Sequence, residues 1–161
     1  MRCDGDGRAI PRPPASSQGV SLRMSRARNR DTGPELALRQ LLYRNGVRYR
    51  IQYRPPFLSR RTIDIAFPER RLAVFIDGCF WHGCPLHGTR PKSNGDWWAS
   101  KLEANGRRDR DTDDILRTAG WSVLRFWEHE NPAAACELVL TTHTELGRGA
   151  RAGGSAGRSG D

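Results

Sequence analysis

The segment FIDGCFWHGCPLHG, residues 75–88, combines side chains that bind metals with side chains that stack on flat rings. Cys79, Cys84 and His87 follow the pattern C-x4-C-x2-H, and thiolates and imidazoles so spaced are typical ligands of tetrahedral zinc. A fourth ligand must come from another segment, and His129, just after the run WSVLRFWE, is the favoured donor. Because protein atoms would fill every coordination position, these residues predict a structural zinc site.

Two other interpretations of the cysteines stay open. Cys136 is a rival fourth ligand, although its Ala and Leu neighbours favour a thiol buried in a core. Cys79 and Cys84 are, in the plainest alternative, buried thiols without a metal. Four cysteines at these uneven spacings do not resemble the disulfide framework of a small secreted protein, which favours a reducing cellular interior.

Three acids have the chain order of a site for a hard cation. Asp64 interrupts the apolar run TIDIAF, where a charged carboxylate needs a partner or a metal. Asp77 ends the next apolar run, and Glu35 lies in a predicted helix upstream. Metal-dependent nucleases of the restriction-enzyme type share this order, and Mg²⁺ binds through such carboxylates and waters. Helix capping is the alternative role of Glu35, and a turn position is that of Asp77.

Nucleases of this layout also carry a lysine near the second strand acid, and VFIDGCF supplies none. His82 is the nearest replacement, because an imidazole titrates near neutral pH and serves as general base or acid. Phe80 and Trp81 interrupt the same polar loop, and Trp98 is a third ring nearby. These rings are either buried behind the zinc ligands or form a wedge that unstacks bases, which favours mispaired DNA.

The elements that must position these groups form the order helix, three strands, long helix, strand, helix. Capping signals and apolar periodicity predict helices over 32–45, 96–119 and 132–146, and strands over 47–53, 62–67, 71–77 and 121–128. Pro68-Glu69-Arg70 predicts a tight turn between two buried strands. The long helix aligns four residues on one face: Trp98, Leu102, Asn105 and Asp109. The fold class is therefore α/β, with a mixed sheet flanked by helices.

Composition indicates one domain with unstructured ends and a polyanionic partner. We expect a disordered basic arm over 1–22, a domain over 23–146 and a disordered tail over 147–161. The net charge of +9 and the pI near 10.4 favour nucleic acid, although arginine-rich codon usage would give the same charge. No run reaches the roughly 20 apolar residues of a membrane span, so we expect a soluble cytosolic protein.

The chain resembles the very short patch repair endonucleases, bacterial enzymes that nick mismatched DNA. The resemblance covers residues 21–130 and is carried by RDTGPELALRQLL, DGCFWHGCPLHG, PKSNGDWW, KLEANGRRDRD and LRTAGWSVLRFWEHE in that order. It implies a restriction-endonuclease-like fold that recognises T:G mismatches left by deamination of 5-methylcytosine. It also implies a nick on the 5′ side of the thymine.

The resemblance further implies individual roles. Asp64 matches the Mg²⁺-binding aspartate, with the backbone carbonyl of Ile76 as a second ligand, and His82 matches the catalytic histidine. Glu35 and Asp109 match acids that hold metal-bound waters, whereas Asp77 is at a position where some members carry histidine. The rings that intercalate beside the mismatch are matched by Phe80, Trp81 and Trp98. The family's zinc cluster is matched by Cys79, Cys84 and His87, and His129 stands where a cysteine is common.

We therefore expect a monomeric, Mg²⁺-dependent and zinc-stabilised endonuclease whose partner is double-stranded DNA with a T:G mismatch. It would act at the nucleoid in the bacterial cytoplasm, with mismatch-repair proteins as candidate partners. One alternative is a restriction or defence nuclease of the same fold with another DNA target. The other is a zinc-stabilised DNA-binding module without activity.

Overall fold

The computed structural model describes residues 31–58, 60–88 and 94–152, and within these ranges four strands form one mixed sheet. The strand order is β1-β2-β3-β4, with β1–β2 and β2–β3 antiparallel and β3–β4 parallel. The strand bounds are β1 Arg50–Tyr53, β2 Ile63–Phe67, β3 Leu72–Asp77 and β4 Ser122–Trp127. The predicted mixed α/β architecture is thus confirmed.

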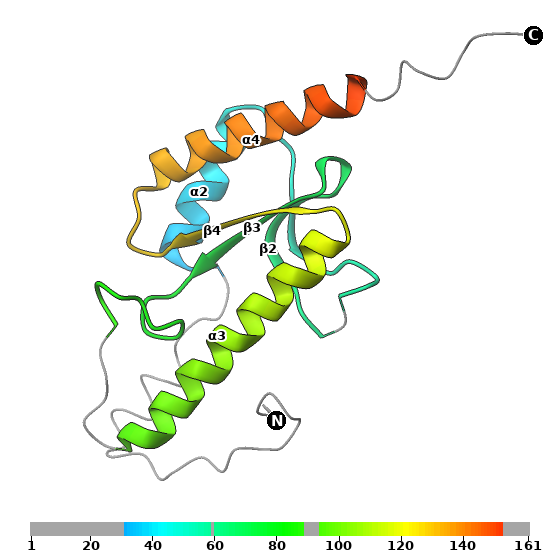
Figure 1. Ribbon diagram of the computed structural model, residues 1–161. Helices are drawn as coiled ribbons and strands as arrows, with labels where there is room; N and C mark the ends of the chain where they lie inside the picture. The colour runs from blue at the N-terminus through cyan, green and yellow to red at the C-terminus, as the bar shows by residue number, and fades with distance from the viewer. Residues whose placement is uncertain (1–30, 59, 89–93, 153–161) are drawn as a thin grey trace, which may run out of the picture.

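Helices cover both faces of this sheet (Figure 1). Helices α2 Gly33–Arg44 and α4 Pro132–Ala152 pack together against one face, and α3 Gly95–Thr118 runs along the other. Alternation along β3 explains the two layers, because successive side chains of a strand point to opposite faces. Leu72 and Val74 join the core under α2 and α4, whereas Ala73 and Phe75 join the core under α3.

The connection between β2 and β3 is the tight turn that the sequence predicts. It consists of the short 3₁₀ helix η1, Pro68–Arg70, followed by Arg71 in the left-handed conformation with φ 49°. The β2–β3 register runs from Ile65↔Val74 to Phe67↔Leu72. The strand pairing ends at Ile65 and Val74. Asp64 of β2 and Asp77 of β3 lie beyond it, at the end of the sheet that carries the candidate site.

Two predicted boundaries differ from the observed ones by three residues or more. The first strand begins at Arg50, three residues later than predicted. Thr32 is the N-cap of α2 as predicted, although among the described residues its side chain makes no capping bond and Glu35 accepts the backbone N–H of Asp31 at 2.8 Å. Helix α4 continues to Ala152 instead of ending at residue 146, so residues 147–152 of the expected tail are helical.

A tertiary contact explains the longer α4. A Cβ atom at Gly147 would lie 3.0 Å from Cζ of Arg70, so the glycine lets this turn of the helix pack closely against the η1 arginine. Local composition alone indicates a helix end there, because glycine is a weak helix former. The predicted arm over 1–22 and residues 153–161 lie outside the described part of the chain. Among the described residues, no helix is long and apolar enough to cross a membrane.

Candidate active site and Cys/His cluster

Asp64 lies where β2 leaves the register with β3, and each of its carboxylate oxygens has a donor. Oδ2 accepts the backbone N–H of Ile76 at 3.0 Å, and Oδ1 accepts the amide of Gln52 at 3.4 Å. The Gln52 amide is oriented in turn by the Thr62 hydroxyl, which donates to Oε1 at 3.1 Å. Burial, together with the charges of Glu35 and Asp77, raises the pKa of Asp64 to about 6. A bound cation would favour the ionised form of this half-buried, partly protonated carboxyl group.

His82 lies between two of the predicted acids. Its Nδ1 atom is 2.6 Å from Oδ2 of Asp109 and 3.7 Å from Oδ1 of Asp77. Burial opposes protonation, but the hydrogen bond to Asp109 and the charge of Asp77 raise the pKa of His82 overall. The hydrogen bond and charge of His82, with the charges of Arg125 and Arg108, lower the pKa of Asp109 despite its partial burial. Because Nδ1 holds the proton shared with Asp109, Nε2 is the ring nitrogen left to accept or donate a proton in chemistry.

The cation that β3 lacks comes from β4. Nη1 of Arg125 donates to both carboxylate oxygens of Asp77, at 2.8 and 3.0 Å. Nε and Nη2 donate to Asp113 at 3.0 and 2.9 Å, and the guanidinium lies 4.3 Å from the Phe75 ring centroid. Even so, burial outweighs the arginine and raises the pKa of Asp77. The guanidinium is thus fully engaged by carboxylates.

Glu35 makes contacts at the start of α2 and also lies close enough to Asp64 for its charge to act there. It is buried, at 4% exposure, and its carboxylate receives the Asp31 N–H and the Arg39 guanidinium, at 2.8 and 3.4 Å. Its charge also acts on Asp64, where it favours the protonated carboxyl. Glu35 therefore fixes the start of α2 and contributes negative charge to the site.

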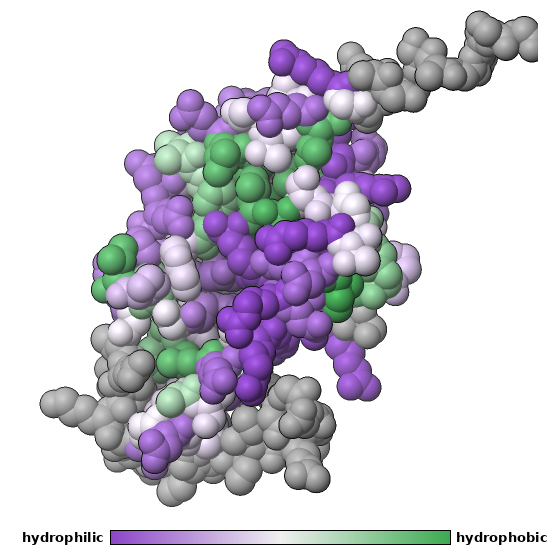
Figure 2. All heavy atoms as spheres, in the orientation of Figure 1, coloured by the Kyte–Doolittle hydropathy of each residue, from purple (hydrophilic) through white to green (hydrophobic). Residues whose placement is uncertain are grey.

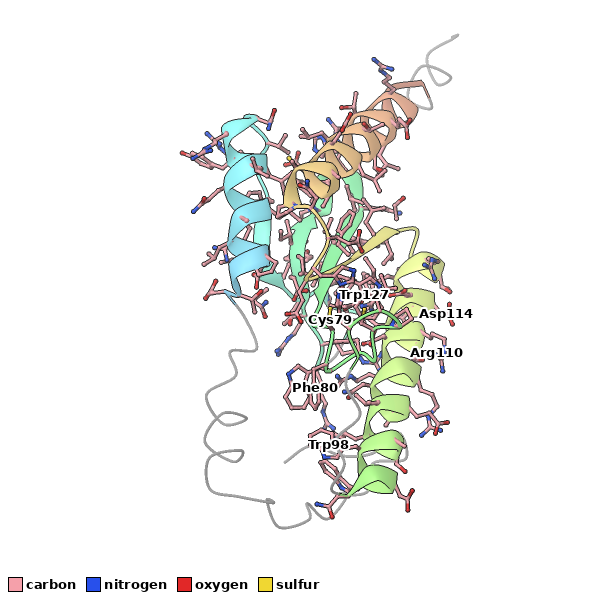
Figure 3. The ribbon with its side chains drawn as sticks, turned by 90° about the vertical axis from the view of Figure 1, so that its left-hand side faces the viewer. Cys79, Phe80, Trp98, Arg110, Asp114 and Trp127 are labelled. Atoms are coloured by element: carbon pink, nitrogen blue, oxygen red, sulfur yellow. The ribbon has the colours of Figure 1, made fainter. Side chains whose placement is uncertain are left out.

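The face of α3 predicted from its periodicity holds the 79–84 loop. Trp98 packs against Phe80 with ring centroids 5.2 Å apart, and Asn105 donates to the carbonyl of Trp81 at 2.8 Å. One turn further, Asp109 meets His82. Figure 3 shows Phe80 and Trp98 on the same side of α3, with the polar labelled residues of that helix on another side. The rings of Phe80, Trp81 and Trp98 therefore form one cluster beside His82.

Four side chains named as zinc ligands converge next to this loop. The ligand atoms of Cys79, Cys84, His87 and His129 all lie within 4.8 Å of one another. Nδ1 of His129 is 3.0 Å from Sγ of Cys79 and 3.8 Å from Sγ of Cys84, and both thiols are free. Around one tetrahedral zinc, such atoms would lie roughly 3.3 to 3.8 Å apart. The donor set fits a zinc ion, whereas Cys136 is a buried thiol in the α2–α4 core.

The cluster is attached to the site through neighbouring residues. The backbone N–H of Cys79 donates to the Glu128 carboxylate at 2.7 Å, and Cys79 is two residues from Asp77. Burial raises the pKa of the Cys79 thiol to about 11, so a metal bound here must displace a proton.

The sequence analysis did not identify two residues of the site, Arg125 and Gln52. Arg125 is in the apolar run WSVLRFW, where a lone charge is a signal as strong as that of Asp64 in β2. Gln52 has φ 46°, a conformation that the sequence of β1 does not reveal. The remaining surface is polar along α3, where hydrophilic side chains gather in the space-filling view (Figure 2).

Comparisons with known proteins agree with this site. A family model described as DNA mismatch endonuclease Vsr matches residues 16–87. The type II nicking enzyme V.NaeI of Lentzea aerocolonigenes is 43% identical over 85% of this chain and 84% of its own length. The chain belongs to the Vsr family. Its similarity extends to the DNA mismatch endonuclease Vsr of Escherichia coli, which is 36% identical over 67% of this chain and 68% of its own length.

Membership of the Vsr family makes the protein an endodeoxyribonuclease. A further Vsr-family relative, the type II nicking enzyme V.XorIIP of Xanthomonas oryzae, is 42% identical over 66% of this chain and 77% of its own length. The family match covers Glu35, Asp64, Asp77, His82 and the 79–87 part of the Cys/His cluster.

Proposed function

We propose that this Vsr-family protein is a Mg²⁺-dependent mismatch nickase. It would cut the strand on the 5′ side of the thymine in T:G mismatches that arise from deaminated 5-methylcytosine. The observation that carries the proposal is the meeting of His82 with Asp77 and Asp109 beside the Phe80–Trp81–Trp98 ring cluster. His82 and two of the rings, Phe80 and Trp81, thus share one loop, and α3 adds Asp109 and Trp98. The domain would be of the restriction-endonuclease type.

Asp64 would be the main metal ligand, with the carbonyl of Ile76 beside it. The donors on Asp64 hold both carboxylate oxygens in place, since one oxygen accepts from Ile76 and the other from Gln52. Bound Mg²⁺ supplies charge stabilisation at the scissile phosphate and its leaving oxygen. Its presence would also favour the ionised form of Asp64, whose pKa of about 6 leaves the carboxyl partly protonated at neutral pH without a cation.

His82 would orient or deprotonate the attacking water through Nε2. Asp109 fixes the tautomer by its 2.6 Å contact with Nδ1, and Asp77 adds negative charge that stabilises the imidazolium formed after proton transfer. Glu35 and Asp109 would also bind waters around the metal. Removing His82 should therefore lower the rate of chemistry more than it lowers DNA affinity.

Mismatch preference would come from the rings. Unstacking a base step costs a few kcal/mol, and the cost is least where a pair is already mismatched. Phe80, Trp81 and Trp98 would move from packing on one another to packing on bases. Their base contacts would then replace ring contacts, so little apolar surface would be newly exposed. Basic surface of the chain, with its net charge of +9, would add affinity that falls with salt.

The Cys/His cluster would hold zinc as a structural ion. Cys79, Cys84, His87 and His129 supply four ligands, and all four positions of a tetrahedron would be filled by protein. The ion would join the 79–87 loop to His129, just past the end of β4, where the backbone N–H of Cys79 also donates to Glu128. The loop carries His82, so the zinc site would hold the catalytic imidazole in place without touching DNA. We further propose that the protein acts as a monomer on chromosomal DNA in the cytoplasm.

Strand-specific cleavage of a duplex panel tests this function. Labelled duplexes carrying T:G, other mismatches or no mismatch are incubated with Mg²⁺ or with EDTA. We expect one nick, 5′ to the thymine, in the T:G duplex with Mg²⁺. Equal cutting of all duplexes would refute the mismatch assignment and favour a restriction or defence nuclease. Binding without any cutting would favour a DNA-binding module.

Two variants separate chemistry from recognition in the same panel. His82→Ala and Asp64→Ala should bind the T:G duplex and fail to cut it. Asp114→Asn changes an exposed carboxylate on α3, at 77% exposure, and should cut as the unaltered protein does. Cutting by Asp64→Ala at the unaltered rate would remove this carboxylate from the mechanism.

A further inference from the structure

We propose that Arg125 is a positioning residue for His82, because one guanidinium contacts both residues whose carboxylates face the His82 ring. It binds the carboxylate of Asp77 and the backbone carbonyl of Asp109. This inference rests on the proposed function, in which His82 acts on the attacking water. It gives a role to the single charged residue of the otherwise apolar run WSVLRFW.

The geometry of Arg125 is that of a clamp between three elements. From β4 it binds the Asp77 carboxylate at the end of β3, at 2.8 and 3.0 Å. It binds the Asp113 carboxylate on α3 at 2.9 to 3.2 Å through Nε and Nη2. Nη2 also donates to the backbone carbonyl of Asp109 at 3.4 Å. One planar side chain therefore sets the distance between the strand that carries Asp77 and the helix turn that carries Asp109.

His82 depends on that distance. Its Nδ1 atom lies 2.6 Å from Asp109 and 3.7 Å from Asp77, so a small movement of α3 relative to β3 changes the ring orientation. The backbone N–H of His82 donates to the carbonyl of Gly78. This bond fixes the main chain of the loop but leaves the imidazole ring free to turn. The orientation of the imidazole is therefore set by the two acids, and the acids are set by Arg125.

Lysine cannot replace this arrangement. An ammonium group is a point charge, whereas the guanidinium presents donors in a flat fork that serves two carboxylates at once. The face of that fork also rests on Phe75, 4.3 Å from the ring centroid, so its plane is fixed. Arg125→Lys keeps the charge and loses the bridge, which makes it the informative substitution.

The matched control is Arg117→Met. Arg117 also pairs with Asp113, at 3.6 Å, but from an exposed position on α3, and its second ion pair among the described residues is with Asp114 on the same helix at 3.8 Å. Both variants remove a partner of Asp113, and Arg125→Lys alone removes the link to Asp77 and Asp109. A purely structural role for Arg125 predicts that the variant loses stability while its folded fraction keeps the His82 geometry.

The experiment measures three quantities on the full chain with its metals. They are single-turnover cleavage of the T:G duplex, affinity for that duplex without Mg²⁺, and the ¹H–¹⁵N signal of the His82 ring N–H. We expect Arg125→Lys to cut about 10- to 100-fold more slowly with affinity changed less than about twofold, since small misplacements of a catalytic group cost rates of this size. We expect its His82 ring N–H signal to exchange with water and disappear. Arg117→Met should match the unaltered protein in all three.

Two outcomes overturn the proposal: an unchanged His82 ring N–H signal in folded Arg125→Lys, or cleavage within about twofold of the unaltered rate. If the unaltered protein cuts no duplex, the proposed function fails, and the ring N–H signal still decides the role of Arg125. If Arg125→Lys does not fold, Asp113→Asn tests the role of Arg125, because this variant weakens the contact with α3 and keeps the Arg125–Asp77 pair. We expect Asp113→Asn to show a smaller loss of cleavage rate and a weaker His82 ring N–H signal, and Asp114→Asn to show neither change.

Discussion

Asp64→Asn tests whether the site holds a half-buried carboxylate whose charge destabilises the fold until a cation binds. The folded-state pKa of Asp64 is about 6, against an ordinary value of 3.8, chiefly because of burial. A carboxyl with a raised pKa stabilises the fold at low pH, and this contribution is lost as the pH rises through the folded-state pKa. The difference in pKa corresponds to about 3 kcal/mol, since one pKa unit is worth about 1.4 kcal/mol.

The assay is urea unfolding between pH 4 and pH 8, with zinc present and Mg²⁺ absent. We expect the free energy of unfolding of Asp64→Asn, relative to the unaltered protein, to rise by up to about 3 kcal/mol between pH 4 and pH 7. The asparagine stays neutral throughout, so the difference isolates this one carboxyl. Asp114→Asn is the control, because its carboxyl is exposed and its difference should stay flat.

Magnesium supplies a second arm of the same experiment. Adding Mg²⁺ at pH 7 should stabilise the unaltered protein and leave Asp64→Asn unchanged, because a ligand that binds the folded state stabilises it. A difference between the two proteins that does not vary with pH would refute the burial argument. Equal stabilisation of both proteins by Mg²⁺ would refute Asp64 as the metal ligand.

Three further outcomes are expected. Cys84→Ser should lose the bound zinc measured by elemental analysis and unfold at least about 5 °C lower, since a structural zinc contributes folding energy directly, whereas Cys136→Ser should keep the metal. His82→Ala should cut the T:G duplex at least about 100-fold more slowly with nearly unchanged affinity, and equal losses in both would contradict its catalytic role. Phe80→Ala should weaken T:G binding by about 1 to 3 kcal/mol while binding of matched DNA changes less. A uniform loss on both duplexes would argue against a wedge.

Local sequence was enough to predict the elements of this fold in their order. Capping signals and apolar periodicity depend on neighbouring residues, and they placed α3 and η1 within one or two residues of their observed bounds. The same locality explains the failures. Thr32 is the N-cap of α2 as predicted, but Glu35 accepts the N–H of Asp31, and α4 extends past its predicted end, where Gly147 packs on Arg70.

The candidate site divides in the same way. Short segments contain the C-x4-C-x2-H spacing, the lone acid of β2 and the polar face of α3. The structure brings the Cys and His ligands together, places Asp109 against His82, and places Asp64 within reach of the charges of Glu35 and Asp77. Arg125 was overlooked because its partners, Asp77 and Asp113, are 48 and 12 residues away along the chain.

The sequence by itself therefore determined which side chains are candidates for binding metals and moving protons, and on which elements they lie. Only the tertiary structure decided which of them meet. Parallel pairing of β3 with β4 places Phe75 beside Arg125, and α3 crosses that pair to bring in Asp109 and Asp113. Strand order and helix docking are set by the burial of the whole core, and no short stretch of sequence encodes them.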